Sequence, residues 1–185
     1  MDSPSAIATT RLILRDYTPA DAAEALVINA DEEVMRYLGG VQHRTVDEIR
    51  EFLECVAAKY ARYRERGLPH GAWAVRERDG GALVGTALLK PLPDAAGADT
   101  DAIEVGWHLA RAAWGKGYAT EFGKALLERG FSQLDVQELH AVVDPGNVRS
   151  EAVAKRLGFT HRGLVDAWYG KTFEHFTLER AEWFS

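Results

Sequence analysis

The sequence predicts a mixed α/β fold, with a central sheet of about seven strands flanked by about four helices. Three observations predict it. Short segments with alternating or dense apolar residues are typical of strands. Longer segments with capping signals and apolar residues at three- and four-residue steps are typical of helices. The two kinds of segment interleave as β-α-α-β-β-β-α-β-α-β-β, which favours helices packed on the faces of a mixed sheet.

Length and composition fit one globular domain. The chain has 185 residues, of which 46% are hydrophobic and 27% are charged, and these are ordinary globular values. We expect residues 1–9 to be a flexible tail and residues 10–185 to be a single domain. The net charge of −6 gives no general attraction for nucleic acid or an anionic membrane. The longest nearly apolar stretch, 82–89, is too short to cross a bilayer.

The cysteine count and the first residues bear on location. Cys55 is the one cysteine, so no internal disulfide can form, and a reducing compartment is favoured. The N-terminal residues have neither a basic run nor an apolar segment, so no secretory signal is expected. Together these features predict a cytoplasmic protein.

The first half of the chain predicts a strand, two helices and a hairpin. Residues 10–15 alternate as a strand, and Thr18 is a cap for a helix that runs to about residue 29, with a short second piece at 31–37. A capping box at 45–48 begins a long helix that ends near Gly67. Strands at 72–75 and 82–89 meet at a turn containing Gly80 and Gly81. The Pro-rich segment that follows, up to residue 101, is expected to be a surface connection.

The second half predicts three strands and two helices after a further strand at 102–109. A helix is expected at 118–130, a strand at 138–143, and a helix at 148–157 that ends at Gly158. The strands 160–168 and 172–179 complete the sheet as a hairpin.

The strongest functional signal is a glycine-containing loop between a strand and a helix. Gly115 and Gly117 flank Lys116, and the helix begins at Tyr118. Glycines leave backbone N–H groups accessible, and a helix N-terminus favours negative charge, so this arrangement suits a phosphate. Lys116 adds a point charge. Alone, the pattern also fits a tight turn, and it matches neither a P-loop nor a dinucleotide fingerprint.

Further motifs accompany this loop, at segments 10–15, 106, 114–121, Asn147-x-x-Ser150, 157–159 and 168–178. With this ordered set the sequence resembles the GNAT N-acetyltransferase family, and within it the RimJ/RimL-like branch. It implies a GNAT fold in which the fourth and fifth strands splay apart. It also implies acetyl-CoA as cosubstrate and a primary amine as acceptor, with direct attack in a ternary complex.

The resemblance further implies where acetyl-CoA binds. The loop backbone would cradle the pyrophosphate, and the pantetheine arm would pair with the strand at 107–109. The expected cofactor-binding residues are Trp107, His108, Leu109, Gly115, Lys116, Gly117, Tyr118, Ala119, Thr120 and Asn147. Trp114 stands where the family often has Gln or Arg.

Two residues are candidates for catalysis. Glu104 alternates onto the same strand face as Gly106 and His108, and is the candidate base. Its alternative role is a solvated carboxylate or an ion-pair partner. Ser150 would lie in the first turn of a helix capped by Asn147, near the departing thiolate. Its alternative role is helix capping.

The acceptor is less well defined. Tyr37, Leu38, Trp168 and Tyr169 are candidate substrate-binding residues. An α-amino group, with a pKa of about 7.7–8.0, is easier to neutralise than lysine at about 10.4. A protein or peptide N-terminus is therefore the first choice and a small amine the second.

Three further interpretations follow. The histidines share no metal-ligand spacing, so no metal is expected. A homodimer remains open. The alternative function is a non-catalytic acyl-CoA-binding sensor, although the presence of Glu104, Ser150 and an unbroken loop favours an enzyme.

Overall fold

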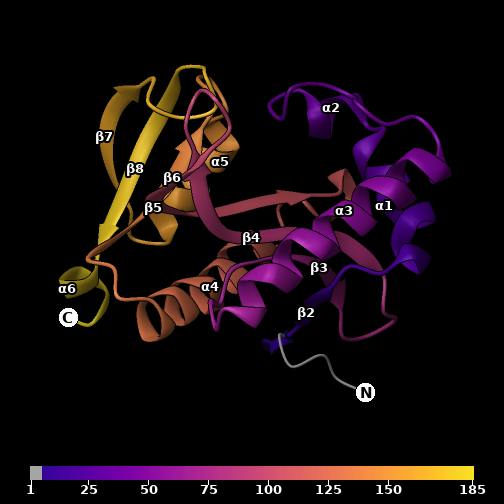
Figure 1. Ribbon diagram of the computed structural model, residues 1–185, viewed down its shortest axis with the longest axis horizontal. Helices are drawn as coiled ribbons and strands as arrows, with labels where there is room; N and C mark the ends of the chain where they lie inside the picture. Colours follow the sequence, from indigo (N-terminus) through magenta and orange to yellow (C-terminus); the bar gives the residue numbers. More distant parts are fainter. Residues whose placement is uncertain (1–5) are drawn as a thin grey trace.

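The computed structural model describes residues 6–185, and its strands form one eight-stranded mixed sheet (Figure 1). The strand order is β1-β2-β3-β4-β5-β6-β8-β7. The strands are β1 (Ile7–Ala8), β2 (Leu12–Asp16), β3 (Gly71–Glu77), β4 (Leu83–Pro93), β5 (Asp99–Leu109), β6 (Glu138–Val143), β7 (Thr160–Val165) and β8 (Phe173–Glu179). The helices are η1 (Pro19–Asp21), α1 (Ala22–Asn29), α2 (Glu32–Met35), α3 (Val46–Glu65), η2 (Arg111–Ala113), α4 (Tyr118–Gln133), α5 (Val148–Arg156) and α6 (Arg180–Trp183).

The sheet divides between β5 and β6. These strands are parallel and share a single register pair, Glu104 with His140, whereas β5 pairs with β4 in antiparallel register from Gly85–Leu109 to Pro93–Asp99. Beyond Glu104 the two strands therefore separate, and Figure 1 shows β6, β7 and β8 turned away from the rest of the sheet. The predicted fold class, including the splayed strands, is confirmed.

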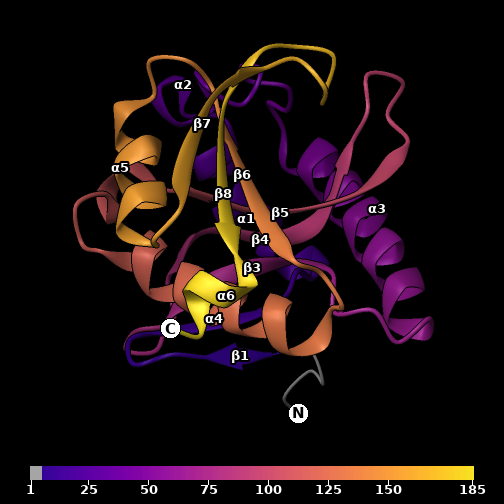
Figure 2. The same ribbon diagram turned by 90° about the vertical axis from the view of Figure 1, so that its left-hand side faces the viewer.

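Helices cover both faces of the larger half of the sheet (Figure 2). Successive residues of a strand point to opposite faces, and the neighbours Trp73 and Ala74 accordingly belong to different hydrophobic clusters. Trp73 shares its cluster with Phe122 and Leu126 of α4. Ala74 shares its cluster with Ile49 of α3 and with residues of α1. The core thus holds the diverging strands between two helical layers.

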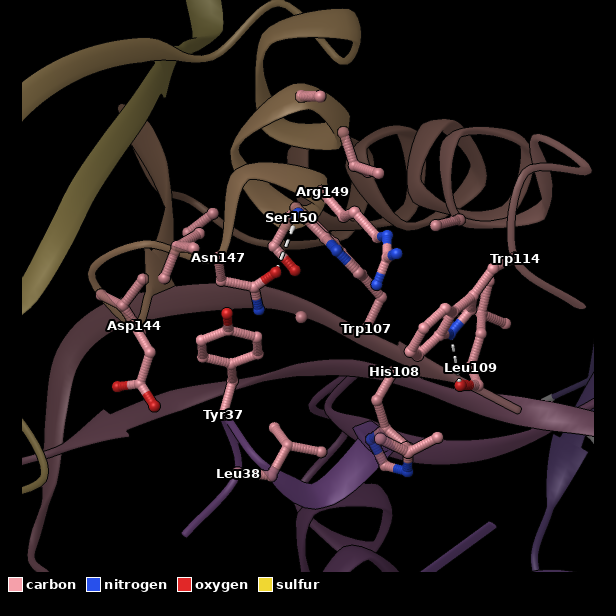
Figure 3. Close-up of a pocket in the computed structure, with 18 of the residues that line it drawn as sticks. Tyr37, Leu38, Trp107, His108, Leu109, Trp114, Asp144, Asn147, Arg149 and Ser150 are labelled. Carbon is pink, nitrogen blue, oxygen red and sulfur yellow. Dashed lines mark hydrogen bonds between the residues drawn. The ribbon is translucent and has the colours of Figure 1, made fainter. Parts of the chain in front are cut away.

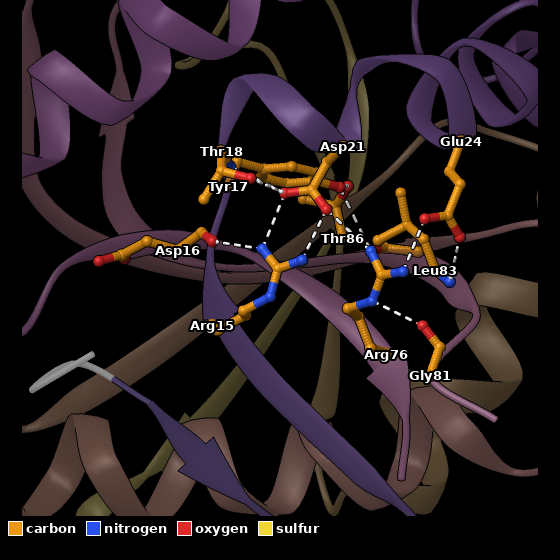
Figure 4. Close-up of polar contacts among 11 residues, drawn as sticks. Arg15, Asp16, Tyr17, Thr18, Asp21, Glu24, Arg76, Gly81, Leu83 and Thr86 are labelled. Carbon is orange, nitrogen blue, oxygen red and sulfur yellow. Dashed lines mark hydrogen bonds and ion pairs between the residues drawn. The ribbon is translucent and has the colours of Figure 1, made fainter. Parts of the chain in front are cut away.

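A buried ion network anchors the end of η1 to the sheet (Figure 4). Asp21 is 2% exposed, and its carboxylate accepts hydrogen bonds from Arg15 of β2 at 2.6 and 2.7 Å and from Arg76 of β3 at 2.8 Å. Burial by itself would raise the pKa of Asp21, but the hydrogen bonds from Arg15 and Thr18 outweigh it and lower that pKa. The network therefore keeps Asp21 ionised.

Two features of the strands differ from the sequence prediction. Part of the expected tail, Ile7–Ala8, forms β1 by pairing with β2, and this strand accounts for the eighth; residues 1–5 of that tail lie outside the described part. The expected surface connection after Lys90 is largely a continuation of β4 and β5. Pairing with β3 ends at Leu89, so Pro91 and Pro93 lie on an edge, where a missing N–H is tolerated.

The short C-terminal helix α6 was also absent from the prediction. Within residues 6–185, no helix is both long enough and apolar enough to cross a membrane.

Candidate active site

A pocket of about 890 Å³ lies where β5 and β6 separate. Its wall combines β5, the loop before α4, the end of β6, the first turn of α5, the end of α2 and the segment after β7. Figure 3 shows Tyr37 and Leu38 facing Asn147 and Ser150 across this space. The pocket thus brings together segments from both halves of the sheet.

The glycine loop has an open backbone. Gly115 and Gly117 have φ angles of 75° and 78°, a left-handed conformation that disfavours other residues. A Cβ at Gly115 would meet no atom within 4 Å. Gly117 is the N-cap of α4, and no side chain caps this helix in the described part. The first-turn N–H groups are therefore available to an anionic ligand.

Arg11, which does not line the pocket, contacts the same glycine loop. The guanidinium donates to the carbonyl oxygen of Lys116 at 2.9 Å and pairs with Glu121 of α4 at 2.6 Å. The Lys116 ammonium lies 3.6 Å from Glu77, and Lys116 does not line the pocket. The point charge expected from Lys116 therefore lies outside the pocket, because its side chain turns toward β3.

The pocket side of β5 is a free strand edge. Pairing with β6 ends at Glu104, so the backbone beyond it, toward Trp107 and Leu109, borders the pocket. His108 binds Thr86 through its Nε2 atom at 2.9 Å, and Thr86 in turn contacts the Tyr17 hydroxyl at 2.7 Å. Burial lowers the pKa of His108 to about 4. The imidazole is therefore neutral at pH 7.

An aromatic side chain and a cation connect the loop to α5. The Trp114 indole N–H donates to the carbonyl oxygen of Leu109 at 2.9 Å. The Arg149 guanidinium lies 4.5 Å from the Trp114 ring centroid, and Figure 3 shows these two side chains side by side. Arg149 thus places a positive charge in the wall near the glycine loop.

Asn147 and Ser150 have separate tasks at the start of α5. The Asn147 side chain is the N-cap and accepts a hydrogen bond from the Ser150 backbone N–H at 3.3 Å. The Ser150 hydroxyl makes no hydrogen bond within residues 6–185 and lines the pocket. Capping therefore does not occupy the hydroxyl, which is free to meet a ligand.

Glu104 is buried at the opposite end from the loop. It is 7% exposed, and its Oε2 atom accepts a hydrogen bond from the Tyr169 hydroxyl at 2.6 Å. The Lys90 ammonium lies 3.0 Å from the same oxygen. An ion pair, one of the alternatives that the sequence left open, is therefore present, yet Glu104 still lines the pocket.

The acceptor candidates divide into two groups. Tyr37, Leu38 and Tyr169 line the pocket, and the Tyr37 hydroxyl donates across the gap to the carbonyl oxygen of Gly146 at 3.3 Å. Trp168 does not line the pocket; its ring packs on those of His140 and His175, at centroid distances of 5.6 and 5.0 Å. The structure therefore places Trp168 behind the wall, because the loop turns it toward β6 and β8.

The remaining sequence candidates Tyr118, Ala119, Thr120 and Asn147 all line the pocket. Lys90 and Arg149 are among the residues at the site that the sequence analysis missed. Lys90 is opposite Glu104 in the β4–β5 register, so the correct hairpin turn would have revealed it. Arg149 lies within the Asn147-x-x-Ser150 motif, and its cationic side chain was the available signal.

Comparison with known proteins gives the family. A sequence model described as an acetyltransferase (GNAT) domain matches residues 11–160, which is most of the chain. The chain therefore belongs to the GNAT acetyltransferase family and is an acyltransferase. The N-acetyltransferase YoaA of Bacillus subtilis, whose role is uncharacterized, is 28% identical over 157 residues, covering 85% of this chain and 84% of that protein.

Solved structures show the same fold. RimL, a ribosomal α-N-protein acetyltransferase in complex with coenzyme A, aligns with a TM-score of 0.72 and 18% identity, covering 94% of this chain and 97% of that one. The aminoglycoside acetyltransferase AAC(6')-Ib, also in complex with coenzyme A, aligns with a TM-score of 0.68 and 20% identity, covering 92% and 96% of the two chains.

Proposed function

We propose that this acyltransferase moves an acetyl group from acetyl-CoA to a primary amine, by direct attack in a ternary complex. One observation carries the proposal: a single pocket runs from the open glycine loop at Gly115 to the buried carboxylate of Glu104. An anion-binding end and a proton-accepting end are the two requirements of this reaction.

The residues present fit a diphosphate at the loop. The uncapped first turn of α4 and the positive charge of Arg149 both favour negative charge there. Fold neighbours in complex with coenzyme A support this assignment. The free edge of β5 beyond Glu104 offers backbone donors and acceptors to an arm that contains amides.

The catalytic roles follow from what each group can donate or accept. When bound, acetyl-CoA supplies an acetyl group that is already activated as a thioester. The carboxylate of Glu104 takes the proton from the acceptor nitrogen, directly or through a water molecule. The Ser150 hydroxyl, at the positive end of α5, donates a hydrogen bond to the sulfur as negative charge develops on it.

A protein or peptide α-amine is the first proposed acceptor. Neutralising such an amine at pH 7 costs about 1 kcal/mol, against about 4.6 kcal/mol for lysine. The α-N-protein acetyltransferase RimL shares the fold, and we place this chain in the RimJ/RimL-like branch. A small amine is the second choice, since the aminoglycoside acetyltransferase shares the fold as well.

A thiol-release assay tests the proposal. The panel contains a short peptide with a free N-terminus, the same peptide with a blocked N-terminus and an internal lysine, a polyamine and an aminoglycoside. We expect the highest kcat/KM for the free N-terminus. A higher value for a small amine would reassign the acceptor. Tight coenzyme A binding without turnover of any amine would instead support the sensor role.

A further inference from the structure

The carboxylate of Glu104 is held asymmetrically. The Tyr169 hydroxyl and the Lys90 ammonium both bind its Oε2 atom, whereas Oε1 accepts no hydrogen bond within residues 6–185. A Cβ at position 106 would lie 3.2 Å from Oε1, so Gly106 leaves the space beside this oxygen free. Both Glu104 and Gly106 line the pocket. One carboxylate oxygen is therefore fixed, and the other is left for a ligand.

The backbone of Tyr169 is unusual for a tyrosine. Its φ angle of 55° lies in the left-handed region, which is strained for a bulky residue and occurs most often at functional sites. Its backbone N–H donates to the carbonyl oxygen of Pro93 at 3.0 Å. The loop between β7 and β8 is thus attached to the end of β4, across the gap in the sheet. This attachment brings the phenol within reach of Glu104.

The electrostatic surroundings agree with the geometry. Lys90 donates a hydrogen bond to the Tyr169 hydroxyl as well as pairing with Glu104, so the phenol is oriented to donate its own proton to the carboxylate. Burial and then the charge of Glu104 raise the pKa of Tyr169. The same two causes raise the pKa of Tyr60 on α3. Both phenols are therefore neutral near pH 7. On the other side of Glu104, its register partner on β6 is His140.

We propose that Tyr169 is a positioning residue that fixes the Oε2 atom of Glu104 and so turns its Oε1 atom toward the acceptor nitrogen, with Lys90 as the supporting cation. This inference rests on the proposed function, because it assigns Glu104 as the proton acceptor. It replaces the direct acceptor contact expected for Tyr169 from the sequence. It also makes the C-terminal hairpin part of the catalytic apparatus.

The kinetic test uses Tyr169→Phe, which removes the hydroxyl and keeps the ring. We expect kcat to fall about 10- to 100-fold, since loss of alignment at a reacting group has effects of this order. The KM for acetyl-CoA and the Kd of coenzyme A should not change. Lys90→Met should also lower kcat and leave the KM for acetyl-CoA unchanged, because it removes the second group that binds Oε2.

A matched control is available in Tyr63→Phe. Tyr63 donates from its hydroxyl to Asp99, so the same kind of hydrogen bond is removed, but Tyr63 does not line the pocket. We expect wild-type kcat for this variant. A fall in kcat for Tyr63→Phe equal to that for Tyr169→Phe would overturn the positioning role.

A double variant separates this inference from the proposed function. If Tyr169 acts through Glu104, adding Tyr169→Phe to Glu104→Gln should cause no further loss of kcat. A further loss of full size would overturn the positioning role while acetyl transfer stands. An unchanged kcat in Glu104→Gln alone would also overturn the positioning role while acetyl transfer stands. Absence of turnover in the wild type, with coenzyme A bound, would overturn both.

Discussion

At Gly117 the absence of a side chain serves the backbone conformation and the ligand site together. The residue has a left-handed φ angle and caps α4 without covering the N–H groups of its first turn. Ser150 and Asn147 show the complementary case at α5, where one side chain caps the helix and the other stays free. Each of these positions allows a separate test of binding, catalysis and stability.

Replacing Gly117 with valine should weaken coenzyme A binding at least 10-fold, measured by calorimetry. The Cβ and its branches would crowd the N–H groups, and the left-handed backbone would cost about 1–2 kcal/mol of stability. Gly97→Val is the control, since Gly97 has a φ angle of 84° and open surroundings but does not line the pocket. Equal Kd values for the two variants would contradict the assigned cradle.

Ser150→Ala should lower kcat roughly 10- to 100-fold, because a donor to developing negative charge is removed. The Kd of coenzyme A should hold, and the free energy of unfolding should change by less than about 0.5 kcal/mol, since Asn147 remains as the cap. Asn147→Ala should cost about 1 kcal/mol in urea unfolding. If Ser150→Ala lost stability and kept its kcat, the residue would be structural.

At the scale of elements, contacts from the turn between β1 and β2 to α4 fix the glycine loop. Arg11 binds Glu121 through both its backbone N–H and its guanidinium, and it also binds the Lys116 carbonyl oxygen. Thr9 donates to the same carboxylate at 2.6 Å. The turn between β1 and β2 therefore holds the glycine loop although it does not line the pocket.

Arg11→Met should raise the Kd of coenzyme A by about 3- to 10-fold, the equivalent of one hydrogen bond of roughly 1 kcal/mol. The reason is that the carbonyl of Lys116 loses the donor that orients it. Arg78→Met removes a neighbouring guanidinium, which donates to the carbonyl oxygen of Thr9 at 3.0 Å, and should leave the Kd unchanged. An effect of the same size in both variants would argue against a specific brace at the loop.

Features that depend on local sequence could be predicted, and those that depend on distant pairing could not. The turn at Gly115 and Gly117 and the cap at Asn147 are encoded within a few residues. The pairing of Lys90 with Glu104 depends on the register of a hairpin whose turn was not located. The position of Tyr169 depends on a loop that crosses the gap between the two halves of the sheet, for which no local pattern exists.

At the scale of the whole molecule, buried polar groups secure the packing of the helices on the sheet. The network around Asp21 joins η1, β2 and β3, and Arg76 extends it to Glu24 of α1 at 2.6 Å (Figure 4). His108, Thr86 and Tyr17 form a second hydrogen-bonded chain, between the pocket and β2. Both assemblies make global stability depend on protonation.

Asp21→Asn should lower the free energy of unfolding by about 3–5 kcal/mol, because Arg15 and Arg76 would lose the anion between them. Urea unfolding followed by circular dichroism measures this change. Asp47→Asn, at an exposed pair with Arg50 on α3, should change stability by less than about 1 kcal/mol. Similar values for the two variants would show that the buried network contributes no more than a surface pair.

The low pKa of His108 predicts a loss of stability in mild acid. Burial lowers this pKa from its ordinary value of 6.5 to about 4, so the unfolded chain takes up a proton in a range where the folded protein does not. The free energy of unfolding should therefore fall as the pH falls from about 6.5 to about 4.

His108→Gln should reduce this loss, as measured by urea midpoints at pH 7 and pH 5. Burial also lowers the pKa of His70, His140 and His175, so a smaller slope should remain in the variant. An identical slope in wild type and variant would contradict the assignment to His108.

The single ladder position shared by β5 and β6 has a mechanical consequence. One pair, Glu104 with His140, joins two hydrogen-bonded arrays that are otherwise complete, and a few contacts such as Tyr37 with Gly146 span the rest of the opening. A ligand rich in amides that bound in this opening would supply the hydrogen-bond partners that a neighbouring strand supplies elsewhere in the sheet. As more of the protein bound this ligand, the two halves of the sheet would become more rigid relative to each other. Resistance to proteolysis would measure both changes.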